Sequence, residues 1–287
     1  GGSGDSKPWI VGSIGSANVF EECHEGAIYL HHGRQYLVTK LDRDERIVSV
    51  EPVQAAHYTR ALKDKETEIL SRDRTRPAGN FRLVQGRVKV TTRITGYERR
   101  RVRGQDLLGT EKLDLPPTSF ETTSVWIEMP DEIPAAIQAT GRHVMGGIHA
   151  VEHAALSHFP LFALCERHDV AGISYLRHPQ LGRAAVFFYD QHAGGVGLAP
   201  SVFERIDTLL ETTLELIRDC PCEEGCPSCV HSPKCGSGNR PIDKEASIRI
   251  LELLIGQGEL PAIERREAQP SPLPDSRKTG APADAPP

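Results

Sequence analysis

Five of the seven cysteines lie within sixteen positions, in the pattern C-x-C-x3-C-x2-C-x5-C. Thiolates at this spacing, with Gly225 and prolines turning the backbone between them, suit a tetrahedral zinc ion with sulfur ligands at about 2.3 Å. A set in which Cys235 replaces Cys220 stays open, because spacing alone does not separate the two. Four protein ligands leave no position for water, which favours a structural zinc. The ligands we expect are Cys220, Cys222, Cys226 and Cys229.

A pair of disulfides is the alternative for the same cysteines. Disulfide frameworks usually occur in short secreted domains with an even number of cysteines. Seven is an odd number, and no secretory signal precedes the cluster. Free thiols without a targeting segment indicate a reducing, cytoplasmic location instead. Cys23 and Cys165 stand apart from the cluster, and we expect them to be ordinary thiols.

A second group of polar residues could also do chemistry. His149, Glu152 and His153 are spaced i, i+3 and i+4, so a helix places them on one face. Asp190 and His192 come at the end of a predicted strand. A metal-dependent hydrolase using His149, His153 and Asp190 is therefore one alternative function. A polar patch where a helix meets a sheet explains the same pattern, and the zinc-protease pattern H-E-x-x-H is absent.

A glycine-rich loop, Gly194-Gly-Val-Gly197, precedes a predicted helix. Backbone N–H groups at such a helix N-terminus can cradle a phosphate. The loop lacks the lysine of G-x-x-x-x-G-K-[ST], and a tight turn from strand to helix explains it equally well. With no such loop and no D-E-x-H box, the chain is not a nucleotide-driven motor of the P-loop kind by itself.

The charge of the chain is unevenly distributed. The formal net charge is −5, yet the segment 60–112 has fifteen Lys and Arg against seven Asp and Glu, a local balance of +8. A strand and the turn after it could present these side chains to a phosphate backbone. A solvated sheet face is the alternative for the same residues. The candidate DNA contacts are Arg87, Lys89, Arg93, Arg99, Arg100, Arg101 and Arg103.

The pattern of apolar residues predicts an α+β fold: a β-rich N-terminal subdomain, followed by a mixed helix and strand domain that holds the four-cysteine zinc site. Short apolar runs predict a meander over 28–53 and strands at 81–84, 86–95, 125–127, 172–176 and 184–189. Between Arg87 and Ile94 the sequence alternates, with Val88, Val90 and Ile94 on one face. The arginines from Arg99 onward continue the basic face of this strand or, in the alternative, lie in an exposed loop.

Helical spacing of apolar residues predicts three helices in the second half of the chain. The first runs over about 142–158, and Pro160 ends or restarts it. A capping box, Ser201-Val-Phe-Glu204, is expected to start the helix that leads into Cys220. Asp243 is expected to cap the last helix. Two helices would then enter and leave the zinc site, so that the metal fixes how they cross.

Prolines and composition divide the chain into four segments. Residues 1–4 resemble a scar left after removal of a tag, and residues 263–287 are rich in proline and are expected to be disordered. Between them we expect a β-rich subdomain over 5–115 and a zinc-binding domain over 116–262. No run of eighteen apolar residues occurs, so we expect no membrane span.

The stretch from Cys220 to Lys244 resembles the zinc-binding domain at the C-terminus of the MrfA/SftH-type DEAD/DEAH-box helicases. Further stretches that carry the resemblance are 25–38, 113–117, 147–153 and 189–197. The resemblance implies a bacterial superfamily 2 helicase that moves 3′ to 5′ on single-stranded DNA and serves DNA repair. Its ATP-binding motor domains would precede this region, so the chain would be a C-terminal fragment. The zinc ligands of that family correspond most directly to Cys220, Cys222, Cys226 and Cys229, and Cys235 also belongs to the family's longer pattern.

The function that follows is an accessory region that binds or guides single-stranded DNA and supports the motor domains without ATP turnover of its own. Zinc would be its cofactor, and ATP would bind only at the motor domains. A zinc-ordered scaffold that docks the motor domains or a repair partner is the alternative of a different class. The hydrolase remains the third.

Overall fold

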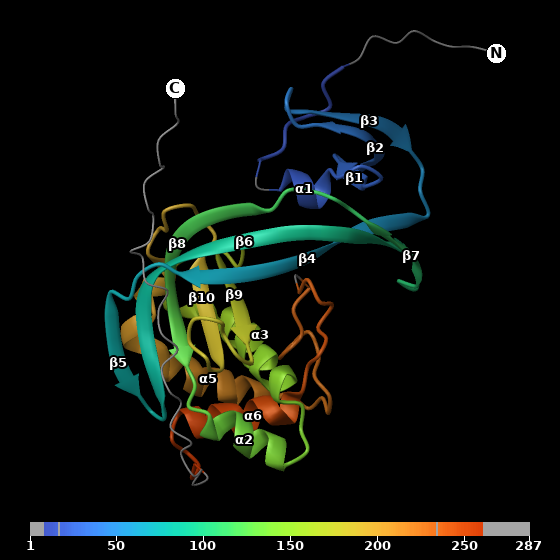
Figure 1. Cartoon of the computed structure of the whole chain (residues 1–287). Coiled ribbons are helices and arrows are strands. Elements are labelled where there is room, and N and C mark those ends of the chain that lie inside the picture. The colour runs from blue at the N-terminus through green and yellow to red at the C-terminus, as the bar shows by residue number, and fades with distance from the viewer. Residues whose placement is uncertain (1–8, 17, 234, 261–287) are drawn as a thin grey trace, which may run out of the picture.

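The computed structural model describes residues 9–16, 18–233 and 235–260. The expectations for residues 1–4 and 263–287 lie outside this part of the chain. Within it the predicted α+β class is confirmed, with two antiparallel sheets and a layer of helices. Figure 1 shows a small sheet above the arched strands of a large one, with the helices gathered below. No helix of the described residues is long and apolar enough to cross a membrane.

The small sheet consists of the first three strands of the chain, in the order β1-β2-β3. This confirms the predicted meander. The sheet buries Cys23, Ala27 and Val38 in a cluster of its own. It contacts the large sheet where the amide of Ile28 donates to the hydroxyl of Thr59. Its elements are α1 (Val19–Glu22), β1 (Ile28–His31), β2 (Arg34–Asp42) and β3 (Ile47–Val53).

The large sheet has seven strands, five of them in the order β4-β6-β8-β10-β9, while β5 and β7 pair with β6. Every pairing is antiparallel. Strands from before and after Pro116 belong to this one sheet. Whether the segments 5–115 and 116–262 fold as separate domains stays a prediction. The strands are β4 (His57–Ile69), β5 (Arg74–Ala78), β6 (Phe81–Arg101), β7 (Leu107–Lys112), β8 (Thr118–Glu128), β9 (Val170–Tyr175) and β10 (Ala185–Asp190).

The sheet curls until its two outer strands, β4 and β9, meet through side chains. The Tyr175 hydroxyl accepts the amide of Thr67 at 2.7 Å. Beyond β9, the Gln180 side chain bonds both the amide and the carbonyl of Ile69. The concave side holds an apolar cluster that includes the stacked rings of Trp126 and Phe187. Closure by polar side chains therefore encloses a second core on the side away from the helices.

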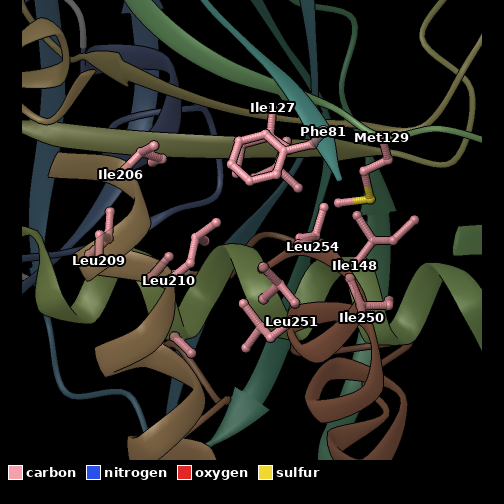
Figure 2. Close-up of a cluster of buried hydrophobic side chains, with 14 of the residues drawn as sticks. Phe81, Ile127, Met129, Ile148, Ile206, Leu209, Leu210, Ile250, Leu251 and Leu254 are labelled. Carbon is pink, nitrogen blue, oxygen red and sulfur yellow. The ribbon is translucent and has the colours of Figure 1, made fainter. Parts of the chain in front are cut away.

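The other face of the sheet is covered by four helices. They are α2 (Glu132–Ala139), α3 (Val144–Phe162), α5 (Ile206–Asp219) and α6 (Lys244–Leu254). Figure 2 shows Phe81 and Ile127 of the sheet facing Leu210, Leu251 and Leu254 of the helices. Each such side chain, fully buried, contributes about 1.5–3 kcal/mol. This cluster is the main core of the molecule.

Helix α6, the last element of this core, contacts both the β5–β6 turn and helix α3. The backbone amide of Asn80 donates to the carbonyl of Leu254, and its side chain donates to the carbonyl of Leu253, both at 2.8 Å. Helices α3 and α6 are in close contact because Gly147 has no side chain: a Cβ there would lie 2.7 Å from that of Ala246. The β5–β6 turn, α3 and α6 thus lock one another in place.

Strand β6 is longer than the sequence predicted. It continues through Gly86, where a Cβ would lie 2.1 Å from the carbonyl oxygen of Ser71, so only glycine allows the two backbones to approach. It also includes Arg99, Arg100 and Arg101, because each pairs with β4 on one side and the first two also pair with β7. The alternative of an exposed loop is therefore wrong for Arg99, Arg100 and Arg101. The alternation of buried Val88, Val90 and Ile94 is confirmed.

The predicted capping box at Ser201 is also wrong. Ser201 is the last residue of α4 (Leu198–Ser201), and its hydroxyl donates back to the carbonyl of Leu198. A short 3-10 turn, Phe203–Arg205, follows, and α5 begins at Ile206 without a side-chain cap. The chain already turns into a helix at Leu198, so Ser201 arrives too late to start one. The cap at Asp243 is confirmed, since its carboxylate accepts the amide of Ala246 at 2.9 Å.

Candidate metal centre and nucleic-acid interface

The sulfurs of Cys220, Cys222, Cys226 and Cys229 converge, and all four lie within 4.8 Å of one another. Four of the sulfur pairs are 3.5–3.8 Å apart. Sulfurs at 2.3 Å from a tetrahedral zinc would be about 3.8 Å apart, so the set fits the ion. These residues, the first of the two predicted ligand sets, would hold zinc. No oxygen or nitrogen side chain is needed to complete the coordination.

Two helices and a tight turn position these sulfurs. Helix α5 ends at Cys220, and the amides of Cys229 and His231 both donate to the carbonyl of Cys226 to close the turn. The amide of Cys226 points at the sulfur of Cys229 at 3.4 Å. Amides directed at thiolates offset their negative charge. The local sequence thus folds as a compact loop between two helices, as predicted.

Lys244, the first residue of α6, ties this loop to the helix. Its ammonium donates to the carbonyls of Cys220 and Cys222, both at 2.6 Å, and the residue is 7% exposed. A zinc ion with four thiolates carries a net charge of −2, which a nearby buried cation stabilises. No pattern in the sequence marked Lys244 as part of the site. A lysine at the start of a helix is a weak signal until the carbonyls that it meets are known.

Cys235 lies outside the four-sulfur group and contacts two histidines of α3. Its sulfur is 3.4 Å from Nε2 of His149, and the donor atoms of Cys235, His149 and His153 all lie within 4.8 Å of one another. Burial raises the pKa of the Cys235 thiol, but hydrogen bonds with the two histidines outweigh it and lower the pKa to about 4. Burial lowers the pKa of His149, but the bond to Cys235, the charge of Glu152 and the bond to the Pro241 carbonyl together outweigh it and raise the pKa to about 8. His149 and His153 do lie on one face of α3, but the third residue of their cluster is Cys235 and not Asp190.

Asp190 is buried, and its carboxylate binds backbone amides of the glycine loop. Its carboxylate accepts the amides of Val196, Gly197 and Ala199 at 2.6–2.7 Å and the amide of Leu198 at 3.2 Å, and it is 0% exposed. These are the amide groups that a phosphate would need. The glycine loop is therefore a tight turn closed around an internal carboxylate. Asp190 is also absent from the His149 cluster, which leaves the hydrolase without its proposed carboxylate.

The seven basic residues proposed for DNA fall into two groups. Arg87, Arg99 and Arg100 bond carboxylates at 2.5–3.2 Å, those of Glu121, Glu111 and Glu98 respectively. The second group is held loosely or not at all. Arg93 and Arg101 have carboxylates only at 4.0 and 3.8 Å, and in the described part of the chain Lys89 and Arg103 have none within 4 Å. The second group is better placed to bind an external phosphate.

A large groove lies between β4, α3, β9 and the loop 232–241, with a volume of about 1050 Å³. Lys65, Arg167 and Arg240 bring positive charge to it, and Glu21 and Glu152 bring negative charge. The His149, His153 and Cys235 cluster opens into this groove. No pattern in the sequence predicted the groove, because its walls come from several segments that are far apart along the chain.

Comparison with known proteins agrees with this geometry. Residues 151–230, which include the four clustered cysteines, match the family described as MrfA Zn-binding domain. The chain is 31% identical over 246 residues to "Uncharacterized ATP-dependent helicase YprA" of Bacillus subtilis, and 27% identical over 277 residues to "ATP-dependent helicase HRQ1" of Saccharomyces cerevisiae. These matches cover 85% and 92% of the chain but only 31% and 25% of the relatives.

A solved structure described as "Crystal Structure of DUF1998 helicase MrfA bound to DNA" is also similar. The TM-score is 0.56 at 27% identity, over 83% of this chain and 31% of that one. The fold and the cysteine centre define a zinc-binding domain of the kind found in helicases. The chain belongs to the family of MrfA-type helicases and corresponds to the region that contains the MrfA Zn-binding domain.

Proposed function

We propose that this region binds single-stranded DNA for an ATP-dependent helicase and supports its motor domains, in the service of DNA repair. The observation that supports the proposal best is the likeness, over 83% of the chain, to a helicase that was solved bound to DNA. Zinc would act structurally, by holding α5 and α6 together through the cysteine loop. ATP would bind at motor domains and not at this region.

Lys89, Arg93, Arg101 and Arg103 would make the phosphate contacts. They lie along β6 and the turn after it, and their charges are not consumed by close carboxylates. Arg87, Arg99 and Arg100 would have to break an internal ion pair to bind a phosphate, so each would contribute less free energy to DNA binding. Contacts of this kind release counterions and make binding steeply dependent on salt.

The test is binding of the chain to a labelled single strand and to a duplex of the same length across a salt series. We expect tighter binding to the single strand. The double variant Arg101→Ala/Arg103→Ala should lower the slope of log K against log salt by about two, one for each lost phosphate contact. It should weaken binding to all sequences alike.

Arg177→Ala/Arg183→Ala is the matched control. Both arginines are exposed and, in the described part of the chain, lack an ion pair, but they lie on the turn between β9 and β10. The control should bind as the parent does. An equal loss in both double variants would reject the assignment to β6, and no binding at low salt would reject DNA binding by this region.

A scaffold for the motor domains is the second candidate, and one feature of the surface favours it. The turn from β6 to β7 exposes three apolar side chains, Val102, Leu107 and Leu108, at 54%, 54% and 46%. Large apolar side chains exposed within one short segment can mark a surface for protein contacts. If DNA does not bind, calorimetry with the separate motor domains should detect an interaction that Leu107→Ser weakens.

A further inference from the structure

We propose that His149, His153 and Cys235 bind a second zinc ion, at a site distinct from the four-cysteine centre. The three side chains come from one face of α3 and from the loop that follows the cysteine turn. Two nitrogens and one thiolate are donors that zinc favours. The match to the family ends at residue 230, before Cys235, and neither ligand set predicted for the cysteines contains the two histidines.

The hydrogen bonds of both histidines support the assignment. Nδ1 of His149 lies 2.9 Å from the carbonyl oxygen of Pro241, and Nδ1 of His153 lies 2.9 Å from that of Val230. A carbonyl oxygen only accepts, so each Nδ1 carries the hydrogen. The other ring nitrogen, Nε2, then offers its lone pair to a metal, which in His149 displaces the proton shared with Cys235. Histidine ligands of metals are commonly oriented by a second hydrogen bond of this kind.

The distances within the cluster are compatible with one ion. A zinc ion at its usual distances to nitrogen and sulfur holds these two atoms about 3.6 Å apart in a tetrahedral arrangement. Nε2 of His149 and the sulfur of Cys235 are 3.4 Å apart, and all three donors lie within 4.8 Å. The two imidazoles lie at 60° to one another, with centroids 4.2 Å apart, in an edge-to-face arrangement.

The surroundings distinguish this site from the closed four-cysteine one. Three protein donors leave a fourth position of a tetrahedral zinc for another ligand. The groove of about 1050 Å³ supplies access to that position, and Lys65 and Arg167 on its walls suit an anionic ligand. Glu152 turns away and accepts the Ser174 hydroxyl at 2.6 Å, so it does not close the site. The ion would present an open coordination position to the groove.

The experiment is metal analysis of the purified full chain after equilibration with zinc and removal of loosely bound ions. We expect two zinc ions per chain in the parent, and one in Cys235→Ser and in His149→Ala. Cobalt substitution adds a second readout, because Cys235→Ser should remove the absorption from one of five thiolates and leave that of the four-cysteine centre unchanged.

Two controls match the substitutions in chemistry. Cys165→Ser removes a thiol outside both clusters, and His192→Ala removes a histidine that lines the same groove but lies outside the triad. Both should keep two zinc ions. One ion per chain in the parent would overturn the proposal. So would two ions in both triad variants, and so would the loss of both ions in Cys235→Ser, which would place Cys235 in the first centre.

Discussion

The ammonium of Lys244 joins the cysteine turn to helix α6 at the level of single residues. It bonds the carbonyls of Cys220 and Cys222, and its charge opposes that of a zinc tetrathiolate. A buried donor that holds ligands in place belongs to the outer shell of a metal site, where substitutions commonly cost ten- to a hundred-fold in metal affinity. Lys244 is therefore as much part of the zinc site as the cysteines that it orients.

We expect Lys244→Met to lower zinc affinity by about ten- to a hundred-fold, since the methionine fills the space but donates no hydrogen bond. Competition with a chromophoric chelator measures the change. Arg249→Met is the control on the same helix, because Arg249 pairs with Glu252 at the surface and does not contact the cysteine turn. Equal affinities in the two variants would show that Lys244 does not support the site.

The residues at each site differed in how well the sequence predicted them. The four cysteines were found because they lie within ten positions, so local spacing was enough. The triad was found only in part: a helix face relates His149 to His153, but Cys235 joins them from 82 positions further along the chain. Asp190 was read as a catalytic candidate, yet it binds backbone amides. The sequence alone does not distinguish a catalytic aspartate from one that binds backbone amides.

The elements that the sequence missed have two causes: tertiary pairing that overrides a weak local pattern, and prolines that suggest a loop where a helix begins. Strand β4 is rich in charge between Lys63 and Glu68, and it is held by its pairing with β6. Helix α2 was missed because prolines suggested a loop. Pro134 lies in its first turn, where the missing N–H has no partner to lose. Helices α5 and α6 were predicted, because their apolar stripes are regular.

The closure between β4 and β9 includes a histidine that should make stability depend on pH. His178 is 0% exposed, Nε2 faces the carbonyl of Thr67 at 3.1 Å, and Nδ1 has no partner within the described structure. Burial lowers its pKa below the usual 6.5, aided by Arg72 and opposed by the Thr67 bond and Glu128. The unfolded chain therefore takes up the proton first as the pH falls.

The consequence is a loss of stability on acidification that begins near pH 6.5 and continues down to the lower pKa of the folded state. This histidine alone changes the free energy of unfolding by at most about 1.4 kcal/mol per pH unit. In His178→Gln the slope between pH 7 and 5.5 should be smaller, as measured by urea unfolding. His168→Gln, at an exposed position, should keep the parent slope. A slope unchanged in His178→Gln would contradict the account.

The whole molecule has one main core that the sheet and the helices share, and this bears on what zinc removal does. The core includes Cys229 and Val230 of the metal loop together with Phe81 and Ile127 of the sheet. A structural zinc can contribute on the order of 10 kcal/mol, as much as the entire stability of a typical domain. Loss of zinc should therefore disturb the sheet as well as the helices.

We expect a chelator to lower the thermal unfolding midpoint, and excess zinc to restore it. Far-UV circular dichroism follows the helices, and the fluorescence of Trp126, which is 0% exposed, follows the sheet. Coincident transitions would indicate a single cooperative unit across Pro116. Two separate transitions would support independent folding of the segments on either side. A midpoint unaffected by chelation would reject a structural role for the metal.

The bonds from Asn80 to Leu253 and Leu254 have a consequence for how the protein is made. Asn80 and Leu253, which the side-chain bond joins, are 173 positions apart in the sequence. A ribosome that adds about 5–20 residues per second needs roughly 10–35 s to bridge that separation. During this interval β5 and β6 have emerged while the helix that covers their apolar face has not been synthesised. The nascent chain therefore exposes Phe81 and Leu83 during this interval, and exposed apolar surface of this kind favours aggregation.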